Sequence, residues 1–134
     1  MFLDDGHEAM HAIMVSLAVA QFPIVVNCTV GGDGTGLVIA LLRELTRVHR
    51  DDVVADYALS GQRTETLSAQ IHERSMADGR DREHSLRLLA CEPDAMAATL
   101  THLDHAHGGI ERYMGAIGLE PAQVSASRGA LVEP

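Results

Sequence analysis

The stretch from Cys28 to Gly36 contains four glycines in nine residues, and it restricts the fold more than any other feature of the sequence. Such a stretch predicts a loop, because glycine weakens the interiors of helices and strands. The preceding residues Ile24–Val26 are apolar and β-branched, which is typical of a short buried strand. After the loop, apolar residues recur at helical spacing over Gly36–Val48, with Thr35 as the expected N-cap. The sequence therefore predicts a strand, a loop and a helix in succession.

The rest of the chain is predicted to be helical, so the fold class is mainly α with a minimal β element. Asp4 and Asp5 are expected N-caps of a helix from about Asp5 to Gln21, which Pro23 ends. The length fits one domain over residues 1–134. Further helices are expected from Asp51–Asp52 onward, over Thr64–Met76, from Pro93 to about His105, over Ile110–Ile117 and from Glu120–Pro121, with a loop over Ala77–Glu83.

The predicted strand has no obvious partner in this arrangement. Its backbone N–H and C=O groups need hydrogen bonds, because unpaired groups are costly in a core. Either Phe2–Leu3 supplies a second strand, or another chain does, or Ile24–Val26 is not a strand. The second alternative predicts a homodimer or a larger assembly.

The negative net charge of the chain argues against polyanionic partners such as nucleic acid and anionic membranes. The formal net charge is −9 and the ten basic residues are all arginine, without a basic stripe. We therefore expect neither nucleic acid nor an anionic membrane as partner. Cys28 and Cys91 match no metal-ligand spacing, and no leader or uninterrupted apolar span is recognised, so a cytoplasmic location is expected.

The loop after the apolar run has the composition of an anion site. Backbone N–H groups of a glycine-rich loop converge into a concave nest, and the following helix N-terminus adds a partial positive charge. A cysteine at the rim of such a nest, here Cys28, gains thiolate character. Together these features predict a nucleophile that faces a bound ligand.

The residues Asn27-Cys28-Thr29-Val30-Gly31-Gly32-Asp33-Gly34-Thr35-Gly36 resemble the signature loop H-C-x-A-G-K-D-R-T-G of bacterial protein-tyrosine phosphatases. The resemblance extends to "GHEAMHAIM" before the loop, to "DDVVADYALS" at Asp51–Ser60 and to the segment Glu92–Leu119. It thus covers nearly the whole chain and implies a truncated phosphatase-like α/β fold that corresponds to the C-terminal half of the family.

The resemblance implies roles for the loop residues. Cys28 matches the nucleophile of the family, Asp33 the general acid, and Thr35 the hydroxyl that assists breakdown of the phosphocysteine. A plain alternative is open for each of them, namely an inert cysteine, a loop aspartate and a simple N-cap. The expected ligand contacts are Asn27, Thr29, Val30, Gly31, Gly32, Gly34 and Gly36.

Three positions depart from the family signature. The arginine of the family falls on Gly34, its lysine on Gly32 and its histidine on Asn27. Because the arginine contacts phosphate with two hydrogen bonds, a comparable loss costs on the order of 10³–10⁵ in rate. We therefore expect phosphomonoester hydrolysis to be nearly abolished. The family also has further strands before the signature, which a partner chain or repacked helices would have to replace.

Other clusters are interpreted as structural. His7-Glu8-Ala9-Met10-His11 matches the zinc-protease pattern H-E-x-x-H, but no third ligand lies at a familiar spacing. His102, His105 and His107 form a second cluster, in which His102 and His105 can face each other across one helical turn, although a solvated helix end is the simpler interpretation. Neither a metal nor a cofactor is therefore expected. The row Arg43, Arg47 and Arg50 is interpreted as a solvated helix face rather than as a replacement for the lost arginine.

Three functions remain open from the sequence. The first is a degenerate phosphatase-like pocket that binds a neutral or weakly anionic small molecule, with a different chemistry such as a step in small-molecule biosynthesis. The second is a pseudophosphatase that binds a phosphorylated or acidic partner without catalysis. The third is a weak phosphatase that uses Cys28 and Asp33. Glycines in place of charged side chains enlarge the pocket and make it less cationic, which favours the first.

Overall fold

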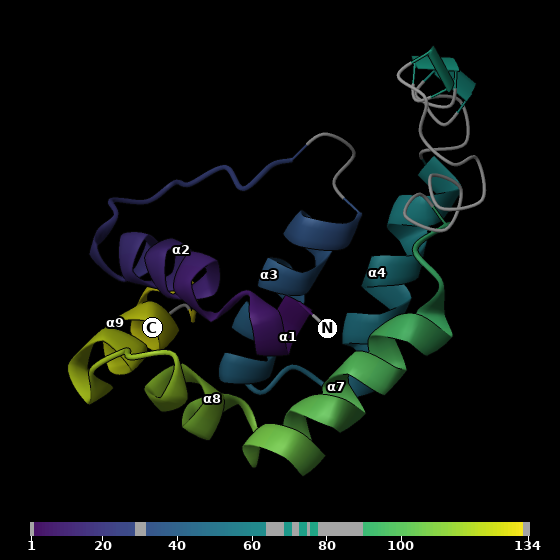
Figure 1. Cartoon of the computed structure of the whole chain (residues 1–134). Helices are drawn as coiled ribbons and strands as arrows, with labels where there is room; N and C mark the ends of the chain where they lie inside the picture. Colours follow the sequence, from purple (N-terminus) through teal and green to yellow (C-terminus); the bar gives the residue numbers. More distant parts are fainter. Residues whose placement is uncertain are drawn as a thin grey trace.

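The computed structural model describes residues 2–28, 32–63, 69–70, 73–74, 76–77 and 90–132, except for the side chains of Phe2 and Asp33. Within these ranges the secondary structure is helical, and no strand is formed. The helices are α1 (Phe2–Asp5), α2 (His7–Val19), α3 (Asp33–Leu45), α4 (Arg50–Arg63), α7 (Pro93–His107), α8 (Ile110–Ala116) and α9 (Pro121–Leu131) (Figure 1).

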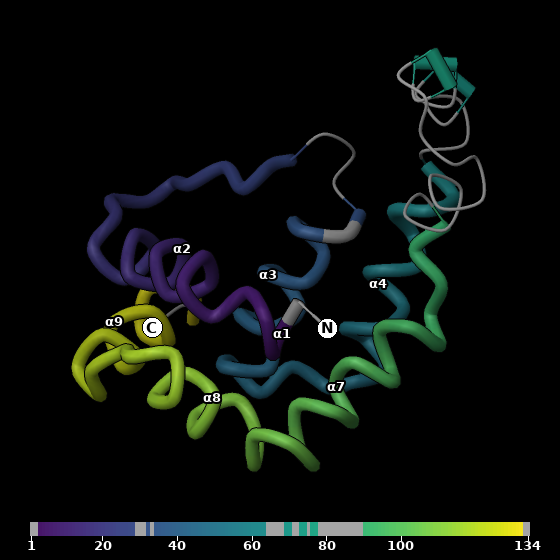
Figure 2. Tube along the Cα trace, viewed as in Figure 1, coloured from purple at the N-terminus to yellow at the C-terminus, as the bar shows by residue number. Residues whose placement is uncertain are grey.

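Helix α3 occupies the middle of the assembly of helices. It contacts α4 on one side and α8 on another, while α4 also packs along α7. Helix α2 lies against the C-terminal helix α9, so segments from the two ends of the chain are neighbours (Figure 2). After α2 the chain runs as an extended segment over residues 20–28 toward the N-terminal end of α3.

The core joins helices from all parts of the chain. Its main cluster consists of leucine, valine, isoleucine and methionine side chains and one tyrosine, as expected for a sequence so poor in aromatic residues. Burial of each large apolar side chain contributes roughly 1.5–3 kcal/mol. A second cluster lies between α3, α4 and α7 and contains Ala40, Val53, Met96 and Leu100. The main cluster contains Leu3, Met10, Met14, Leu37, Val38, Leu41, Leu42, Leu103, Tyr113, Met114, Ile117 and Leu119.

The ends of the later helices follow the sequence signals. Pro93 opens α7, where the missing N–H costs nothing. Gly108 ends it with a left-handed backbone (φ 74°), and its N–H donates to the carbonyl of Asp104 at 2.9 Å. Helix α9 begins after Glu120, whose backbone N–H donates to the side-chain oxygen of Gln123 at 2.8 Å.

The prediction of a strand over Ile24–Val26 is wrong within the described chain. These residues are extended but pair with no neighbouring strand, and the proposed partner Phe2–Leu3 belongs to helix α1. Leu3 is instead fully buried in the main core cluster. Without a second strand, the backbone of the extended segment cannot form a ladder.

Three residues predicted as N-caps, Asp4, Asp5 and Thr35, do not occupy that position. Asp4 and Asp5 lie inside the short helix α1, and Gly6 occupies the N-cap position of α2. Helix α3 begins at Asp33 with Gly32 as its N-cap, three residues before the predicted start. Thr35 therefore lies in the first turn of α3.

The remaining sequence predictions fall partly outside the described residues. Most of the helix expected over Thr64–Met76 and of the loop expected over Ala77–Glu83 is not described. The described helices of α4, α7, α8 and α9 agree with the predicted positions to within a few residues. Among the described helices, none combines the length and the hydrophobicity that a membrane crossing requires.

Candidate functional site

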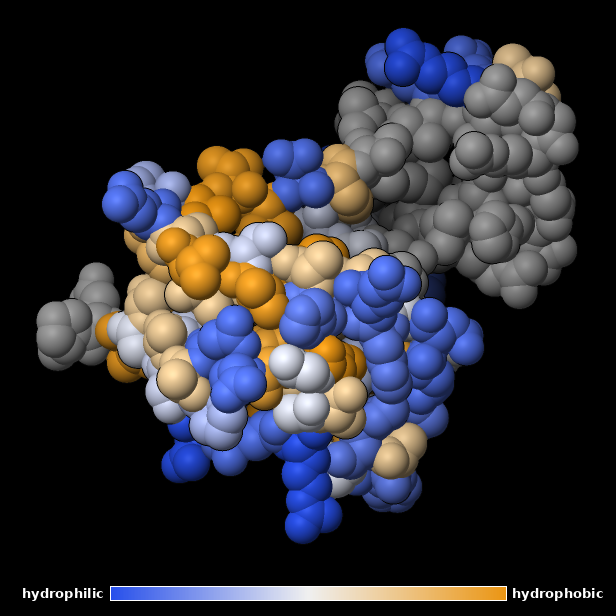
Figure 3. Space-filling view, turned by 60° about the vertical axis from the view of Figure 1, so that its left-hand side comes forward, coloured by the Kyte–Doolittle hydropathy of each residue, from blue (hydrophilic) through white to orange (hydrophobic). Residues whose placement is uncertain are grey.

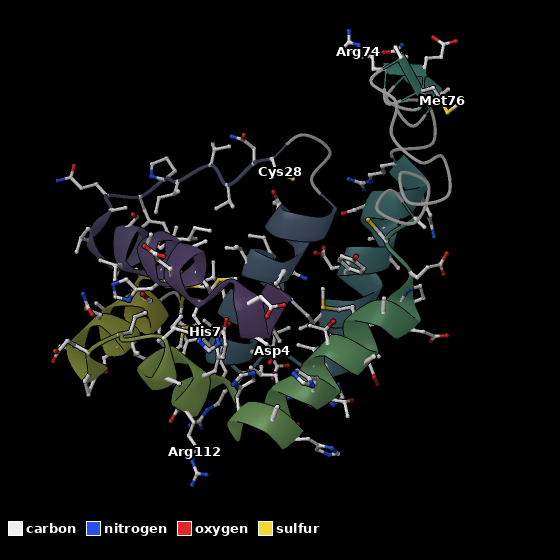
Figure 4. All side chains as sticks on the ribbon, viewed as in Figure 1. Asp4, His7, Cys28, Arg74, Met76 and Arg112 are labelled. Atoms are coloured by element: carbon white, nitrogen blue, oxygen red, sulfur yellow. The ribbon has the colours of Figure 1, made fainter. Side chains whose placement is uncertain are left out.

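A groove of about 520 Å³ lies beside Cys28. One wall is α2, the opposite wall is the extended segment that ends at Cys28, and the first turn of α3 closes one end. In Figure 4, Cys28 lies beside the N-terminal end of α3. The lining residues are Ala12, Ile13, Ser16, Leu17, Ile24, Val25, Val26, Asn27, Cys28, Gly34, Thr35 and Val38.

The groove is uncharged and mainly apolar. No acidic or basic side chain occurs among its described lining residues, and most of the polar groups gather at the end next to Cys28. The Thr35 hydroxyl is buried there and has no hydrogen-bond partner among the described residues. A buried hydroxyl without a partner costs roughly 1–3 kcal/mol. Thr35 lines both this groove and the smaller pocket between α3 and α4, so its hydroxyl is a candidate polar contact at this end of α3.

The predicted site residues divide into four groups. Asn27, Cys28, Gly34 and Thr35 line the groove together. Gly32 is the buried N-cap of α3 and accepts a 2.8 Å hydrogen bond from the N–H of Gly36. Gly36 lies on the other side of α3, at a smaller pocket of about 90 Å³ between α3 and α4. Thr29, Val30, Gly31 and the side chain of Asp33 lie outside the described residues.

Gly34, the position of the family arginine, is exposed in the first turn of α3 and has free space around it. Apart from its chain neighbours and the backbone of its own helix, a Cβ atom built on Gly34 meets no atom of the described residues within 4 Å. The backbone is helical, so a side chain is compatible with both the conformation and the space. The glycine is therefore not required for packing among the described residues.

The nearby arginines do not replace the lost one. Arg43 forms an ion pair with Asp56 of α4 at 3.0 Å, at the 90 Å³ pocket rather than in the groove. Arg50 binds Glu44 and Asp104. Neither side chain lines the groove beside Cys28. This agrees with the sequence interpretation, in which these arginines do not replace the family arginine.

A second polar cluster joins α1 to the C-terminal end of α7, and the sequence analysis named its histidines but not Asp4. Nε2 of His102 lies 2.9 Å from Oδ1 of Asp4, and Nε2 of His107 lies 3.0 Å from the same oxygen. The ring of His102 contacts that of His107 at a centroid distance of 5.7 Å. Asp4 lies about 100 residues away in sequence, so no local spacing indicated it.

The rings of Tyr113 and His7 pack against this cluster. The ring of Tyr113 lies edge-on to those of His107 and His7, with centroid distances of 5.0 and 5.8 Å. Burial raises the pKa of Tyr113 to about 12. The hydrogen bond from His102, followed by that from His107, lowers the pKa of Asp4, so this carboxylate is ionised at neutral pH.

The two histidines of the H-E-x-x-H pattern do not converge on one point. His7 faces His107 and Tyr113, whereas Nδ1 of His11 lies next to Gly118, 3.3 Å from a Cβ built there. Nε2 of His7 and Nδ1 of His11 are both buried without hydrogen-bond partners in the described part of the chain.

Comparison with known proteins agrees with the signature loop. Residues 1–133 match the family model described as "Tyrosine phosphatase family". The chain is 28% identical over 146 residues to the triple specificity protein phosphatase PtpB of Mycobacterium tuberculosis (strain ATCC 25618 / H37Rv), which covers 95% of this chain and 50% of the relative. It is 27% identical over 106 residues to a tyrosine-protein phosphatase of Nostoc commune, covering 75% of this chain and 36% of that protein. The chain spans about half the length of the first relative and about a third of the second. The chain belongs to the tyrosine phosphatase family.

Proposed function

We propose that the groove beside Cys28 binds a neutral or weakly anionic, largely apolar small molecule and that the chain is not an efficient phosphatase. The carrying observation is the groove itself, which has about 520 Å³ of space and no charged side chain among its described lining residues. Small-molecule sites have volumes of about 300–1,000 Å³ and apolar walls with few polar groups. The groove fits that description.

The distribution of polar groups suggests how such a ligand is oriented. Apolar side chains of α2 and of the extended segment, among them Leu17 and Ile24, contact its hydrocarbon part. The unpartnered Thr35 hydroxyl and the N-terminal end of α3 bind a polar end group. A ligand that buries apolar surface gains about 25 cal/mol per Å², which requires no ionic contact.

The reaction that we propose after ligand binding involves Cys28. Cys28 is exposed at the polar end of the groove, where a thiolate would face the ligand. We propose a reaction other than phosphoester hydrolysis, as in a step of small-molecule biosynthesis, because Gly34 supplies no clamp for a phosphoryl group. A phosphopeptide-binding pseudophosphatase is less favoured because the described lining carries no cation to pair with phosphate.

The experiment combines a binding probe with a turnover assay. The uncharged fluorophore 6-propionyl-2-dimethylaminonaphthalene is titrated into the wild type, with p-nitrophenyl phosphate turnover measured in parallel. Saturable binding of the probe without Cys28-dependent turnover supports the proposal. Ser16→Trp fills the groove from α2 and should weaken binding at least about tenfold, or 1.4 kcal/mol. Ala106→Trp, on an exposed position of α7, is the matched control and should bind as the wild type does.

Other outcomes contradict the proposal. Equal probe binding in Ser16→Trp and wild type places the probe elsewhere. Turnover of p-nitrophenyl phosphate that disappears in Cys28→Ser makes the chain a working phosphatase. Saturable binding of inorganic phosphate at the loop, without turnover, favours the pseudophosphatase.

We also propose that the chain assembles as a homodimer or larger oligomer through the extended segment. Val19, Phe22 and Val25 are 74%, 47% and 83% exposed on and after the end of α2. Figure 3 turns the left-hand side of Figure 1 forward and shows hydrophobic side chains over the upper and central parts of that face. The backbone of residues 24–28 forms no strand ladder, and an edge of that kind accepts a strand from a second copy.

A further inference from the structure

Asp4, His102 and His107 have the ligand types and the spacing of a transition-metal site. Imidazole nitrogens together with a carboxylate are the ligands that Zn²⁺ takes when three protein groups bind it and a fourth position stays open. One ligand atom from each of the three residues lies within 4.8 Å of the other two. The site shares no residue with the groove beside Cys28.

The distances require little movement for an ion to enter. With metal–nitrogen bonds of about 2.0–2.1 Å, neighbouring ligand atoms of a tetrahedral zinc site are about 3.3 Å apart. Nε2 of His102 lies 2.9 and 3.1 Å from the two oxygens of Asp4, and Nε2 of His107 lies 3.0 Å from one of them. Separation by a few tenths of an ångström gives the tetrahedral edge between Asp4 and each histidine, and the two histidine nitrogens lie within 4.8 Å of each other.

Burial and charge around the three residues also favour a cation. The Asp4, His102 and His107 side chains are 38%, 35% and 13% exposed, so the ligands are held by the fold while one side remains open to water. His107 belongs to the last turn of the 15-residue helix α7, where the carbonyl end of the helix carries partial negative charge. The formal net charge of the chain, −9, favours cation binding further.

The surroundings orient the ligands in advance. The ring of Tyr113 lies 5.0 Å from that of His107, and His7 lies 5.9 Å from it on α2. In Figure 4, Asp4 and His7 lie close together near α1, away from Cys28. These ring contacts restrict the orientation of the His107 imidazole before an ion binds.

We propose that Asp4, His102 and His107 form a binding site for a divalent transition-metal ion of the Zn²⁺ class. The ion is held by the two imidazole nitrogens that face Asp4 and by the Asp4 carboxylate. A bound ion links α1 to α7 and so fixes the N-terminus of the chain against the core.

The test uses the full chain after removal of metals with a chelator. Zn²⁺ is titrated in a calorimeter, and Co²⁺ is titrated while its visible absorption is recorded. We expect one equivalent of metal, intense bands of four-coordinate Co²⁺, and a higher Tm with metal. His102→Ala, His107→Ala and Asp4→Asn should each weaken binding at least about tenfold.

Two matched controls distinguish this site from general binding to histidines. His105→Ala removes an exposed histidine from the same helix, and Asp5→Asn removes the neighbouring carboxylate; both should bind as the wild type does. The proposal is overturned if no saturable one-to-one binding occurs, if the chain binds several ions with equal strength, or if all five variants behave alike.

A measurement on the wild type avoids dependence on folded variants. Co²⁺ is paramagnetic, so one equivalent should shift the ring-proton resonances of His102 and His107 strongly in the NMR spectrum. Those of His49, which is exposed in the turn before α4, should remain in place. Shifts at His49 with none at His102 would place the metal elsewhere and reject the site.

Discussion

Arg50 at the start of α4 binds Asp104 on α7, with Nη1 of the arginine 2.6 Å from Oδ2 of the carboxylate. The same guanidinium donates to Glu44 at the end of α3 through Nη2 at 2.8 Å and Nε at 3.1 Å. One side chain therefore links three helices, and Arg50 and Asp104 lie 54 residues apart in the sequence. These helices surround the second core cluster.

Replacement of Arg50 should destabilise the chain. Arg50→Ala leaves Glu44, only 10% exposed at its side chain, without its guanidinium partner. Because Arg50 and Asp104 are 40% and 45% exposed, solvent screening limits the loss to about 1–2 kcal/mol. Urea unfolding measures the change. Arg112→Ala, whose side chain points outward in Figure 4, is the control and should change stability by less than about 0.5 kcal/mol.

Acid should weaken the same contact. The hydrogen bond from Arg50 lowers the pKa of Asp104 below its usual 3.8. A carboxylate with a lowered folded-state pKa stabilises the fold fully above its unfolded pKa and loses that contribution as the pH falls through the folded value. Tm should thus decrease below about pH 4, and the decrease should be smaller in Arg50→Ala. An identical pH profile in the two proteins would show that Asp104 does not titrate with this pairing.

Tyr113→Phe should not destabilise the chain. The Tyr113 hydroxyl is buried and has no hydrogen-bond partner among the described residues. Its removal therefore eliminates an unsatisfied group while the ring keeps its contacts with His7 and His107. We expect a change between zero and about 1 kcal/mol of added stability. A loss above about 1 kcal/mol in urea unfolding would mean that the hydroxyl has a partner such as a bound water.

Alkaline titration provides an independent test of the same burial. The raised pKa of Tyr113, about 12, means that the folded state resists ionisation. The stability that this provides is complete below the unfolded pKa near 10 and is lost as the pH rises toward 12. Absorption at the phenolate band should show one tyrosine that titrates late. Tyr113→Phe should remove that late phase.

Gly34→Arg should restore part of the phosphatase chemistry. The position has open space for a side chain and lies beside Cys28 in the groove. Turnover of p-nitrophenyl phosphate should rise at least about tenfold, below the 10³–10⁵ that an arginine supplies in an intact site. Gly34→Ala should fold with about 0.5–1 kcal/mol more stability and stay inactive. Activity of Gly34→Arg that persists after an added Cys28→Ser would contradict a cysteine nucleophile.

Val25→Asp should dissociate the proposed oligomer. Val25 is 83% exposed on the unpaired extended segment, so a charge there opposes contact with a second copy. Light scattering after size-exclusion chromatography should give about half the mass of the wild type. Val48→Asp, at an exposed valine in the turn before α4, is the control and should leave the mass unchanged. A wild type that is monomeric at high concentration would reject the oligomer.

The sequence by itself determined the features that act over short distances. Pro93 and Gly108 set the ends of α7, because a missing N–H and a left-handed backbone act within one helical turn. The signature around Cys28 identified the family, since its residues are adjacent in the chain. The absence of an arginine from the loop was equally visible, and with it the expected loss of phosphomonoester hydrolysis.

Only the tertiary structure decided what depends on distant contacts. Ile24–Val26 has the composition of a strand but forms none among the described residues, since Phe2–Leu3 is helical and offers no partner edge. Thr35 looked like an N-cap, yet α3 begins at Asp33 and leaves the Thr35 hydroxyl at the groove. Asp4 meets His102 and His107 only because α1 folds onto the end of α7. Strand pairing and side-chain clusters require long-range proximity, which no local pattern encodes.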